Sequence, residues 1–366
     1  MSEIKKKKLL VFHTKVAPYR VDFFNKLAEQ YDMFLCMDRK FVYGGLYTDI
    51  EKTYLFQYRE MRSANGKRAT YNEIKKEINK HKPDIVMVSE CGLISLSVII
   101  YRWLHMGKFK VVSIIDDSYD QLTEGRQFTK RHVMAEKVMI PRFDQVINVD
   151  ERVSTLFRER YGKGVSFPII RDEIKYRNCL TSSLPISRKY IERYRLTGKK
   201  VVLYVGRFVK LKNIPSLINA TRKVEEKNWK LVLVGAGDQE ETIREMASGD
   251  DRIIMTGSLS GNALYAWYNI ANVFVLASYQ EAFGAVTNEA LMAGCKCLIS
   301  NRAGSSCLIE EGTNGYCFDP LNESEMVQKL QLLLRDTRQI EEKPEVRPCL
   351  MQTTFDKEIK KVIDAL

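Results

Sequence analysis

The alternation of short apolar segments with longer amphipathic ones is the feature that most constrains how this chain can fold. The short segments are rich in Val, Ile and Leu, and each has about the length of a buried strand. They occupy residues 7–13, 32–37, 83–89, 110–115 and 144–149, and then 201–206, 230–235, 252–257, 272–278 and 295–300. The segments between them show the apolar spacing of helices. Strands that alternate with helices in this way predict α/β domains with parallel sheets.

Two series of such units predict two domains. A chain of 366 residues exceeds the size at which one hydrophobic core usually stops growing. An irregular polar segment around Pro168 and Pro185 separates the two series, and we expect a linker there. The predicted parts are an N-terminal Rossmann-like domain over 1–170, a linker over 171–187, a C-terminal Rossmann-like domain over 188–345, and a C-terminal segment over 346–366 with a helix that returns to the N-terminal domain.

The charge of the chain favours an anionic partner. Its 58 Lys and Arg against 46 Asp and Glu give a formal net charge of +12. A nucleoside diphosphate, an anionic membrane or a phosphorylated lipid acceptor would fit this charge. Nucleic acid is not expected, because no aromatic-rich RNA-binding motif accompanies the basic residues. A basic stretch over residues 125–142 is either a peripheral contact with anionic lipid or a solvated helix face; its basic residues include Arg126, Lys130, Arg131, Lys137 and Arg142.

The sequence predicts a cytoplasmic protein that contacts a membrane at most peripherally, at its inner face. The apolar segment after the basic N-terminus is too short for a signal peptide. The most apolar stretch of the N-terminal half, residues 92–107, contains Arg102 and is shorter than a membrane span. The eight cysteines form no C-x-x-C pair, which favours buried thiols over a zinc site.

The segment EAFGAVTNEAL, residues 281–291, carries the strongest local signal for a ligand site. It follows a predicted strand and continues into a predicted helix, so Gly284 and the first helical amides are left for a phosphate. Glu281 lies in the loop, and Glu289 lies about one turn into the helix. Ionised carboxylates accept hydrogen bonds from sugar and ribose hydroxyls. Either glutamate alone could instead stabilise the helix through its dipole.

A second segment, VGRFVKLKN at residues 205–213, supplies cations after another strand. Gly206 ends that strand and allows the backbone to approach a ligand closely. Arg207 and Lys212 follow, with Lys210 close enough in sequence to compete. Two cations at this position suit a diphosphate, and a basic loop on a basic protein is the plainer alternative.

Together with LVLVGAGD and GTNGYCFDP, these two segments resemble the family-four retaining glycosyltransferases, the glycosyl transferases group 1. The resemblance extends from about Val201 to Pro320. It implies the GT-B fold, an α/β architecture of two Rossmann-like domains facing a central cleft, with the donor in the C-terminal domain. The chain departs from the family motif at Lys296, where a proline is common, and it has only Gly304 of a paired glycine. The identity of the donor sugar is therefore open.

The resemblance assigns roles residue by residue. Arg207 and Lys212 match the pair that clamps the donor diphosphate. Glu281 matches the residue that contacts the transferred sugar, and Glu289 matches the one that contacts the nucleotide ribose. The loop whose backbone amides would approach the sugar and phosphate consists of Phe283, Gly284, Ala285 and Val286.

The N-terminal half offers fewer candidates. The segment VAPYRVDFFNKLAE, residues 16–29, resembles the beginning of family members that act in bacterial cell-surface polysaccharide assembly. It places Arg20 near the expected cleft, toward the acceptor or the donor phosphates, or else in an ordinary helix start after Pro18. Asp116 and Asp117 stand at a strand end where the family often has a histidine or aspartate that touches the donor sugar. We prefer Asp117, with a cap or turn carboxylate as the alternative.

The sequence therefore predicts a retaining, hexosyltransferase-type glycosyltransferase. It would move a sugar from a nucleoside diphosphate sugar to a hydroxyl of a glycan or lipid-linked acceptor, in capsular, exopolysaccharide or lipopolysaccharide synthesis. Its candidate catalytic residues are Arg207, Lys212, Glu281 and Asp117. No cofactor or metal is expected, and family frequency suggests a UDP-sugar donor. The alternatives are another GT-B enzyme, such as a nucleotide-sugar epimerase, or a non-catalytic basic protein that binds RNA or a membrane surface.

Overall fold

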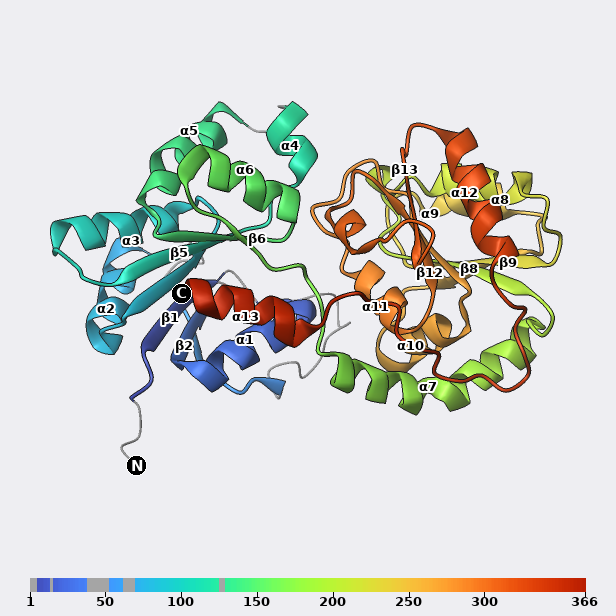
Figure 1. Cartoon of the computed structure of the whole chain (residues 1–366), viewed down its shortest axis with the longest axis horizontal. Coiled ribbons are helices and arrows are strands. Elements are labelled where there is room, and N and C mark those ends of the chain that lie inside the picture. Colours follow the sequence, from blue (N-terminus) through green and yellow to red (C-terminus); the bar gives the residue numbers. More distant parts are fainter. Residues whose placement is uncertain (1–4, 14–15, 38–52, 62–69, 125–128) are drawn as a thin grey trace. The chain divides into compact units, whose positions relative to one another are not determined.

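The structure divides the chain into two compact units, each built around its own sheet (Figure 1). This computed structural model describes residues 5–13, 16–37, 53–61, 70–124 and 129–366. The first unit contains Met1–Ile169 and Asp356–Leu366, and the second contains Ile170–Phe355. Both sheets are parallel and alternate with helices along the chain, which confirms the predicted α/β class. Within the described ranges, no helix has both the length and the apolar character needed to cross a membrane.

The sheet of the first unit has seven parallel strands in the described part of the chain, in the order β3-β2-β1-β4-β5-β6-β7. Their bounds are β1 Lys8–His13, β2 Asp32–Met37, β3 Gln57–Glu60, β4 Ile85–Ser89, β5 Lys110–Ile115, β6 Gln145–Asn148 and β7 Val165–Ser166. Five of these strands are the predicted apolar segments. The sequence did not reveal the two edge strands, because β3 reads QYRE without an apolar run and β7 has only two residues.

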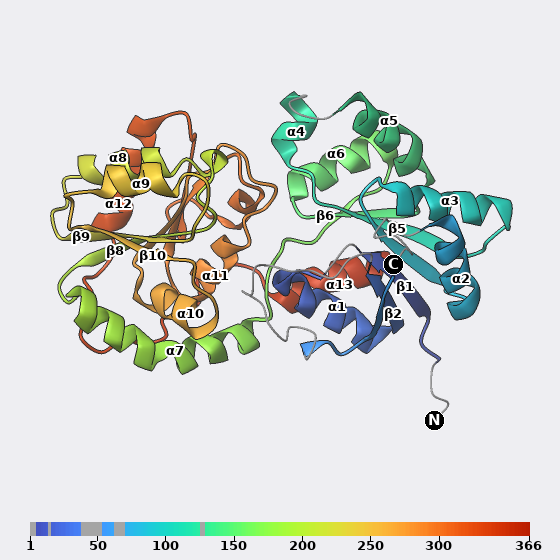
Figure 2. The same cartoon turned by 180° about the vertical axis from the view of Figure 1, so that it is seen from behind.

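The helices of the first unit include the last helix of the chain. Their bounds are α1 Pro18–Gln30, α2 Tyr71–His81, α3 Leu93–Leu104, α4 Tyr119–Glu124, α5 Lys130–Met139, α6 Glu151–Tyr161 and α13 Phe355–Ala365. Figures 1 and 2 show α13 beside α1. Lys26 Nζ of α1 lies 3.4 Å from Asp356 Oδ1, and Lys110 Nζ donates a hydrogen bond to the Leu366 carbonyl at 2.8 Å. These contacts attach the C-terminal helix to the N-terminal sheet.

The sheet of the second unit has six parallel strands in the order β10-β9-β8-β11-β12-β13. Their bounds are β8 Lys200–Val205, β9 Trp229–Val234, β10 Ile253–Gly257, β11 Val273–Leu276, β12 Lys296–Ser300 and β13 Gly315–Phe318. This order is that of a doubly wound Rossmann sheet, in which the direction of strand addition reverses between β8 and β11. Ligands of such sheets bind outside the carboxyl ends of the strands at this reversal. The loops after β8 and β11 are therefore where a site is expected.

Helices cover both faces of this second sheet (Figures 1 and 2). One face carries α8, α9 and α12, and the other carries α7, α10 and α11. Their bounds are α7 Glu173–Tyr194, α8 Ile214–Lys223, α9 Glu240–Ala247, α10 Gly261–Ile270, α11 Val286–Met292 and α12 Glu323–Arg335.

The position of α7 corrects the linker predicted over residues 171–187. The helix begins after Asp172, whose carboxylate accepts a hydrogen bond from the Lys175 amide at 3.1 Å. Its serine-rich stretch is not solvated, because Ser183 is buried and accepts a hydrogen bond from Asn269 of α10 at 2.9 Å. The polar residues that suggested a linker therefore form a polar contact inside the unit, and Pro185 lies within the helix.

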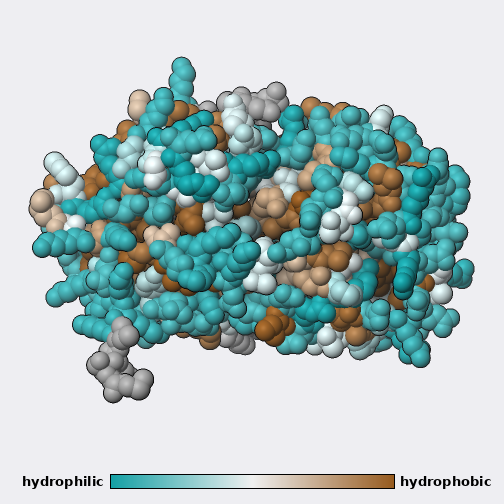
Figure 3. Space-filling view, viewed as in Figure 1, coloured by the Kyte–Doolittle hydropathy of each residue, from teal (hydrophilic) through white to brown (hydrophobic). Residues whose placement is uncertain are grey.

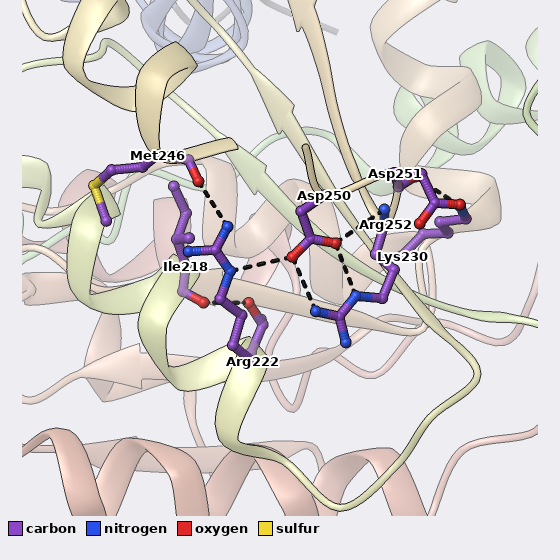
Figure 4. A network of polar contacts seen from close by, with 8 residues as sticks. Ile218, Arg222, Lys230, Met246, Asp250, Asp251 and Arg252 are labelled. Atoms are coloured by element: carbon purple, nitrogen blue, oxygen red, sulfur yellow. Dashed lines mark hydrogen bonds and ion pairs between the residues drawn. The ribbon is translucent and has the colours of Figure 1, made fainter. Parts of the chain in front are cut away.

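Asp250 anchors a network of polar contacts between α8, α9 and the start of β10 (Figure 4). Its carboxylate lies 3.1 Å from Arg222 Nε and accepts two hydrogen bonds from the Arg252 side chain, at 2.8 and 2.9 Å. Arg222 also donates to the Met246 carbonyl at 2.6 Å, and the Arg252 guanidinium lies 4.3 Å from the centre of the Trp229 ring. The hydrogen bonds from Arg252, followed by those from Arg222, hold the pKa of Asp250 well below its usual range against the opposing effect of burial.

We expect Asp250→Asn to lower the free energy of unfolding by about 1 to 3 kcal/mol at pH 7, because two arginines lose a charged acceptor. A lowered folded-state pKa contributes stability above the pKa of unfolded Asp, about 3.9, and this stability is lost as the pH falls. The difference from the wild type should therefore shrink between pH 5 and pH 3, as measured by urea unfolding.

Asp251→Asn is the matched control for this prediction. The Asp251 side chain is 94% exposed, and its carboxylate lies 3.4 Å from Lys230 Nζ. We expect this variant to lose less than about 0.5 kcal/mol, as is usual for an exposed ion pair. An equal loss in the two variants would contradict the role of Asp250.

Candidate functional site

The loops after β8 and β11 bring the two sequence motifs of the second unit together. Tyr279, in the loop after β11, donates its amide hydrogen to the Leu211 carbonyl at 2.8 Å. Leu211 belongs to a short 3-10 turn, Lys210–Lys212, in the loop after β8. This hydrogen bond places Lys212 beside Glu281, and their side chains form an ion pair.

The loops after β8 and β9 pack backbone against backbone. A Cβ atom on Gly235 would lie 1.9 Å from the Gly206 carbonyl oxygen, and one on Gly237 would lie 2.3 Å from the Phe208 oxygen. The Phe208 amide donates to the Ala236 carbonyl at 2.8 Å. Side chains are therefore excluded where the two loops meet, and this fixes the course of the chain on both sides of Arg207.

The two candidate cations after β8 have different surroundings. Lys212 is mostly buried and faces Glu281, whereas Arg207 is exposed and makes no ion pair or side-chain hydrogen bond within the described ranges. Burial and the nearby charge of Arg207 lower the pKa of Lys212 to about 8. An anion bound beside both cations would relieve this repulsion. Lys210 is exposed, so the structure favours Lys212 over Lys210 as the residue of the site.

The loop that carries Glu281 is held by a second backbone contact. The Gly304 amide donates to the Glu281 carbonyl at 3.2 Å, and the Ser305 amide donates to the Phe283 carbonyl at 2.8 Å. A Cβ atom on Gly304 would lie 2.2 Å from the Ala282 carbonyl oxygen, so the two segments meet without room for a side chain. This close approach requires a glycine at position 304.

The residues between this loop and α11 differ in burial, in backbone conformation and in the partners of their amides. Phe283 is buried, so its side chain anchors the loop rather than facing a ligand. Gly284 has φ +91°, a left-handed conformation that favours glycine. Helix α11 begins directly after Ala285, and in the described part of the chain the amides of Ala285 and Val286 have no carbonyl partner. These two amides are donors available at the start of the helix.

Glu289 lies in a separate cluster with Arg171, a residue that the sequence did not single out. Arg171 Nη1 lies 3.2 Å from Glu289 Oε1 and donates to the Tyr265 hydroxyl at 3.1 Å. The Arg171 guanidinium lies 4.9 Å from the centre of the buried Tyr176 ring. Burial alone would lower the pKa of Arg171, but the Glu289 carboxylate raises it above its ordinary value. No motif carried a signal for Arg171, because it lies more than 100 residues before Glu289.

The N-terminal candidates lie at the carboxyl end of β5. Arg20 is buried in α1 and donates to Asp116 Oδ1 at 2.5 Å, so it forms an ion pair with Asp116 rather than with Asp117. Asp117 is also buried, and His132 Nε2 lies 4.0 Å from its Oδ2. The sequence showed no histidine beside Asp117, because His132 follows it only on α5.

Several carboxyl groups gather around Asp117. Burial and the charge of Asp116 raise the pKa of Glu90 to about 8, and burial and Glu136 raise the pKa of Asp117 to about 7. Asp117, His132 and Glu136 each offer a ligand atom, and these atoms lie within 4.8 Å of one another. Their spacing suits a cation. The expectation of a metal-free protein did not consider this set, because its members are scattered along the sequence.

Comparison with known proteins gives a family match within the second unit and a fold for the chain. Residues 187–346 match the family described as glycosyl transferases group 1. An uncharacterized glycosyltransferase of Methanocaldococcus jannaschii, MJ1607, is 31% identical over 142 residues, which cover 38% of this chain and 36% of that protein. The matches to the first curated relatives span 32% to 42% of the length of those proteins.

Two solved structures resemble the whole chain. Anabaena Alr3699/HepE in complex with UDP superposes with a TM-score of 0.74 at 15% identity, covering 98% of this chain and all of that one. The same protein has also been solved with UDP-glucose. The lipopolysaccharide outer core galactosyltransferase WaaB gives a TM-score of 0.65 at 16% identity, covering 98% of this chain and all of that one. These likenesses show that the chain has the GT-B fold.

The conformation of Gly284 predicts a cost for any side chain there. A Cβ atom would lie 2.6 Å from Cδ2 of the buried Leu276, in addition to the strain of a positive φ. We expect Gly284→Ala to lower the free energy of unfolding by about 2 to 4 kcal/mol, through strain and overpacking together. Thermal or urea unfolding measures this loss.

Gly249→Ala separates the two causes. Gly249 has φ +74°, but an added Cβ would meet nothing within 4 Å. This variant should lose only about 1 kcal/mol, the cost of the backbone conformation. If Gly284→Ala lost no more than Gly249→Ala, the close packing of Gly284 against Leu276 would be refuted.

Proposed function

We propose that this protein is a retaining glycosyltransferase that uses a nucleoside diphosphate sugar, and the match of residues 187–346 to the glycosyl transferases group 1 supports this. The sugar is transferred to a hydroxyl group of a glycan or lipid-linked acceptor. One observation carries the proposal: Lys212 and Glu281 meet at the strand-order reversal between β8 and β11, with the uncommitted cation Arg207 nearby. A diphosphate needs cations and a sugar needs acceptors, and this place offers both.

The reaction leaves negative charge on the departing nucleoside diphosphate. Arg207 and Lys212 stabilise this charge, together with the free amides of Ala285 and Val286 at the start of α11. Glu281 accepts hydrogen bonds from hydroxyls of the transferred sugar. Its ion pair with Lys212 holds both side chains in place before the donor binds. No step in this scheme uses a nucleophile of the protein.

Glu289 is proposed to bind the ribose of the donor. Arg171 engages only one of its carboxylate oxygens at 3.2 Å, and a carboxylate can accept several hydrogen bonds. Glu289 can therefore accept a further hydrogen bond from a ribose hydroxyl. In this view Arg171 is a positioning residue, since it fixes the orientation of Glu289 through an ion pair and through its contacts with two tyrosines.

A UDP-sugar is the proposed donor, and a surface polysaccharide is the proposed destination. The support for UDP is the fold shared with Alr3699/HepE, whose structures hold UDP and UDP-glucose. The support for polysaccharide assembly is the likeness to the lipopolysaccharide galactosyltransferase WaaB. In the N-terminal domain, Arg20 is proposed for the acceptor or the donor phosphates, and Asp117 for the donor sugar. We place the protein in the cytoplasm, at the inner face of the membrane where lipid-linked acceptors are found.

Lys212→Ala should lower the rate of sugar transfer from a UDP-sugar by about 100-fold or more, because a developing negative charge loses a preorganised cation. Lys210→Ala is the control: it removes the same charge two residues away, and we expect a change within about twofold. Transfer is measured as released UDP together with the mass of the product. Full activity in Lys212→Ala, or epimerisation of the donor without an acceptor, would contradict the proposal.

Arg171→Met should raise the donor KM about tenfold or more, with a smaller effect on kcat, because Glu289 loses the partner that orients it. Arg188→Met is the matched control on α7, since the Arg188 side chain is 65% exposed and pairs with Glu192. Partial recovery of KM in Arg171→Lys would distinguish positioning from general damage to the fold. An unchanged donor KM in Arg171→Met would rule out this role.

A further inference from the structure

The solvent-facing side of α3 is apolar, which is unusual for a surface helix. Leu93, Ile100 and Leu104 are exposed and recur at the spacing of one helix face. Trp103 beside them is 75% exposed. The opposite side of α3, which includes Val98, packs into the core of the first unit. Helix α3 therefore presents apolar side chains in two directions, and the described residues of this unit cover only one of them.

The apolar surface continues from α3 to α5. Met106, in the turn after α3, is 83% exposed, and Met134 and Val138 are exposed on α5. Arg102 of α3 donates to the Arg142 carbonyl just after α5, which joins the two helices. Seven of the thirteen exposed large hydrophobic residues in the described ranges belong to this surface. Figure 3 shows apolar side chains at the edge of the first unit where α3 lies, surrounded by hydrophilic ones.

Exposed basic side chains lie on the same elements as this apolar surface, which we call the α3–α5 surface. It consists of Leu93, Ile100, Trp103, Leu104, Met106, Met134 and Val138. The exposed basic residues on α5 or just after α3 and α5 are Lys108, Lys130, Arg131, Lys137 and Arg142. The carboxylates nearby are already engaged: Asp144 pairs with Arg102, and Glu136 is buried near Asp117. Arg126, which the sequence also assigned to the basic stretch, lies outside the described residues.

We propose that the α3–α5 surface docks on a bilayer that contains anionic lipid. Exposed tryptophan and other large apolar side chains enter the interfacial layer, while Lys and Arg around them face the lipid headgroups. Helix α3 has 12 residues and spans roughly 18 Å, too short to cross a bilayer core of about 30 Å, so it lies along the surface.

The charge of the surface argues for lipid over a second copy of the chain. A symmetric dimer through this surface would bring two sets of basic side chains together, at a cost in repulsion. Anionic lipid instead complements both the apolar centre and the basic surroundings. The inference extends the proposed function by bringing the enzyme to lipid-linked acceptors, but binding to vesicles requires neither donor nor acceptor.

Vesicle co-sedimentation of the full chain tests this proposal. Vesicles of phosphatidylcholine alone are compared with vesicles that also contain phosphatidylglycerol. We expect the wild type to bind the anionic vesicles at least tenfold more strongly, and this binding to weaken as salt rises. Trp103→Glu should lose at least tenfold of the binding. Leu321→Glu, at another exposed leucine in the second unit, should bind as the wild type does.

Tryptophan fluorescence supplies a second readout on the same samples. The chain has three tryptophans, of which Trp229 and Trp267 are buried, so Trp103 is the one that can report on the surface. A blue shift of its emission on addition of anionic vesicles is expected, because the indole enters an apolar layer. Met106→Glu keeps this reporter and should reduce the shift.

Three results would overturn the proposal. One is the absence of wild-type binding to anionic vesicles, and another is undiminished binding by Trp103→Glu. The third is a concentration-dependent dimer that Trp103→Glu abolishes, without any binding to vesicles, which would assign the surface to self-association. Thermal unfolding shows that each variant is folded. Vesicle binding without binding of any nucleoside diphosphate would refute the proposed function alone, and nucleoside diphosphate binding without vesicle binding would refute this inference alone.

Discussion

The backbones of four loops at the carboxyl edge of the second sheet lie, in two pairs, too close together for side chains. The loops after β8 and β9 meet at Gly206 and Gly235, and the loop after β11 meets the segment around Gly304. A Cβ atom at Gly235 or Gly304 would lie 1.9 or 2.2 Å from a carbonyl oxygen. Because these contacts are between backbones, they fix the positions of the residues that follow each strand. The positions of Lys212 and Glu281 both depend on them.

Two ion pairs form among the charged residues near these loops. Lys212 pairs with Glu281, and Arg171 pairs with Glu289, so each glutamate of the motif has its own cation. Breaking a largely buried pair leaves a charge without a partner, which is costly. Such pairs therefore hold carboxylates in one orientation before a ligand arrives. A fixed acceptor binds a hydroxyl group more tightly than a mobile one, because less conformational entropy is lost on binding.

The first unit has a different electrostatic character inside and outside. Inside, at the carboxyl ends of β4 and β5, Glu90 and Asp117 are carboxyl groups whose burial raises their pKa. Outside, α3 and α5 expose apolar and basic side chains. A carboxyl group whose pKa is raised in this way keeps its proton nearer to neutral pH and carries less negative charge there. The exposed basic residues favour an anionic surface, so part of the positive net charge of the chain belongs to the α3–α5 surface.

Local pattern was sufficient to predict ten of the thirteen strands in the described residues, because buried strands need apolar runs. It missed β3, β7 and β13, which are short or lack such a run. The loop and helix of the segment from Glu281 to Leu291 were predicted because a strand followed by glycine and a helix has a recognisable sequence. The fold class followed from the alternation of these segments. What the sequence could not supply were contacts between residues far apart in the chain. Arg171 reaches Glu289, and His132 reaches Asp117, only because strand order and helix packing bring them together. The same reason explains α7: its serines have the composition of a linker, and only packing against α10 shows that they are buried.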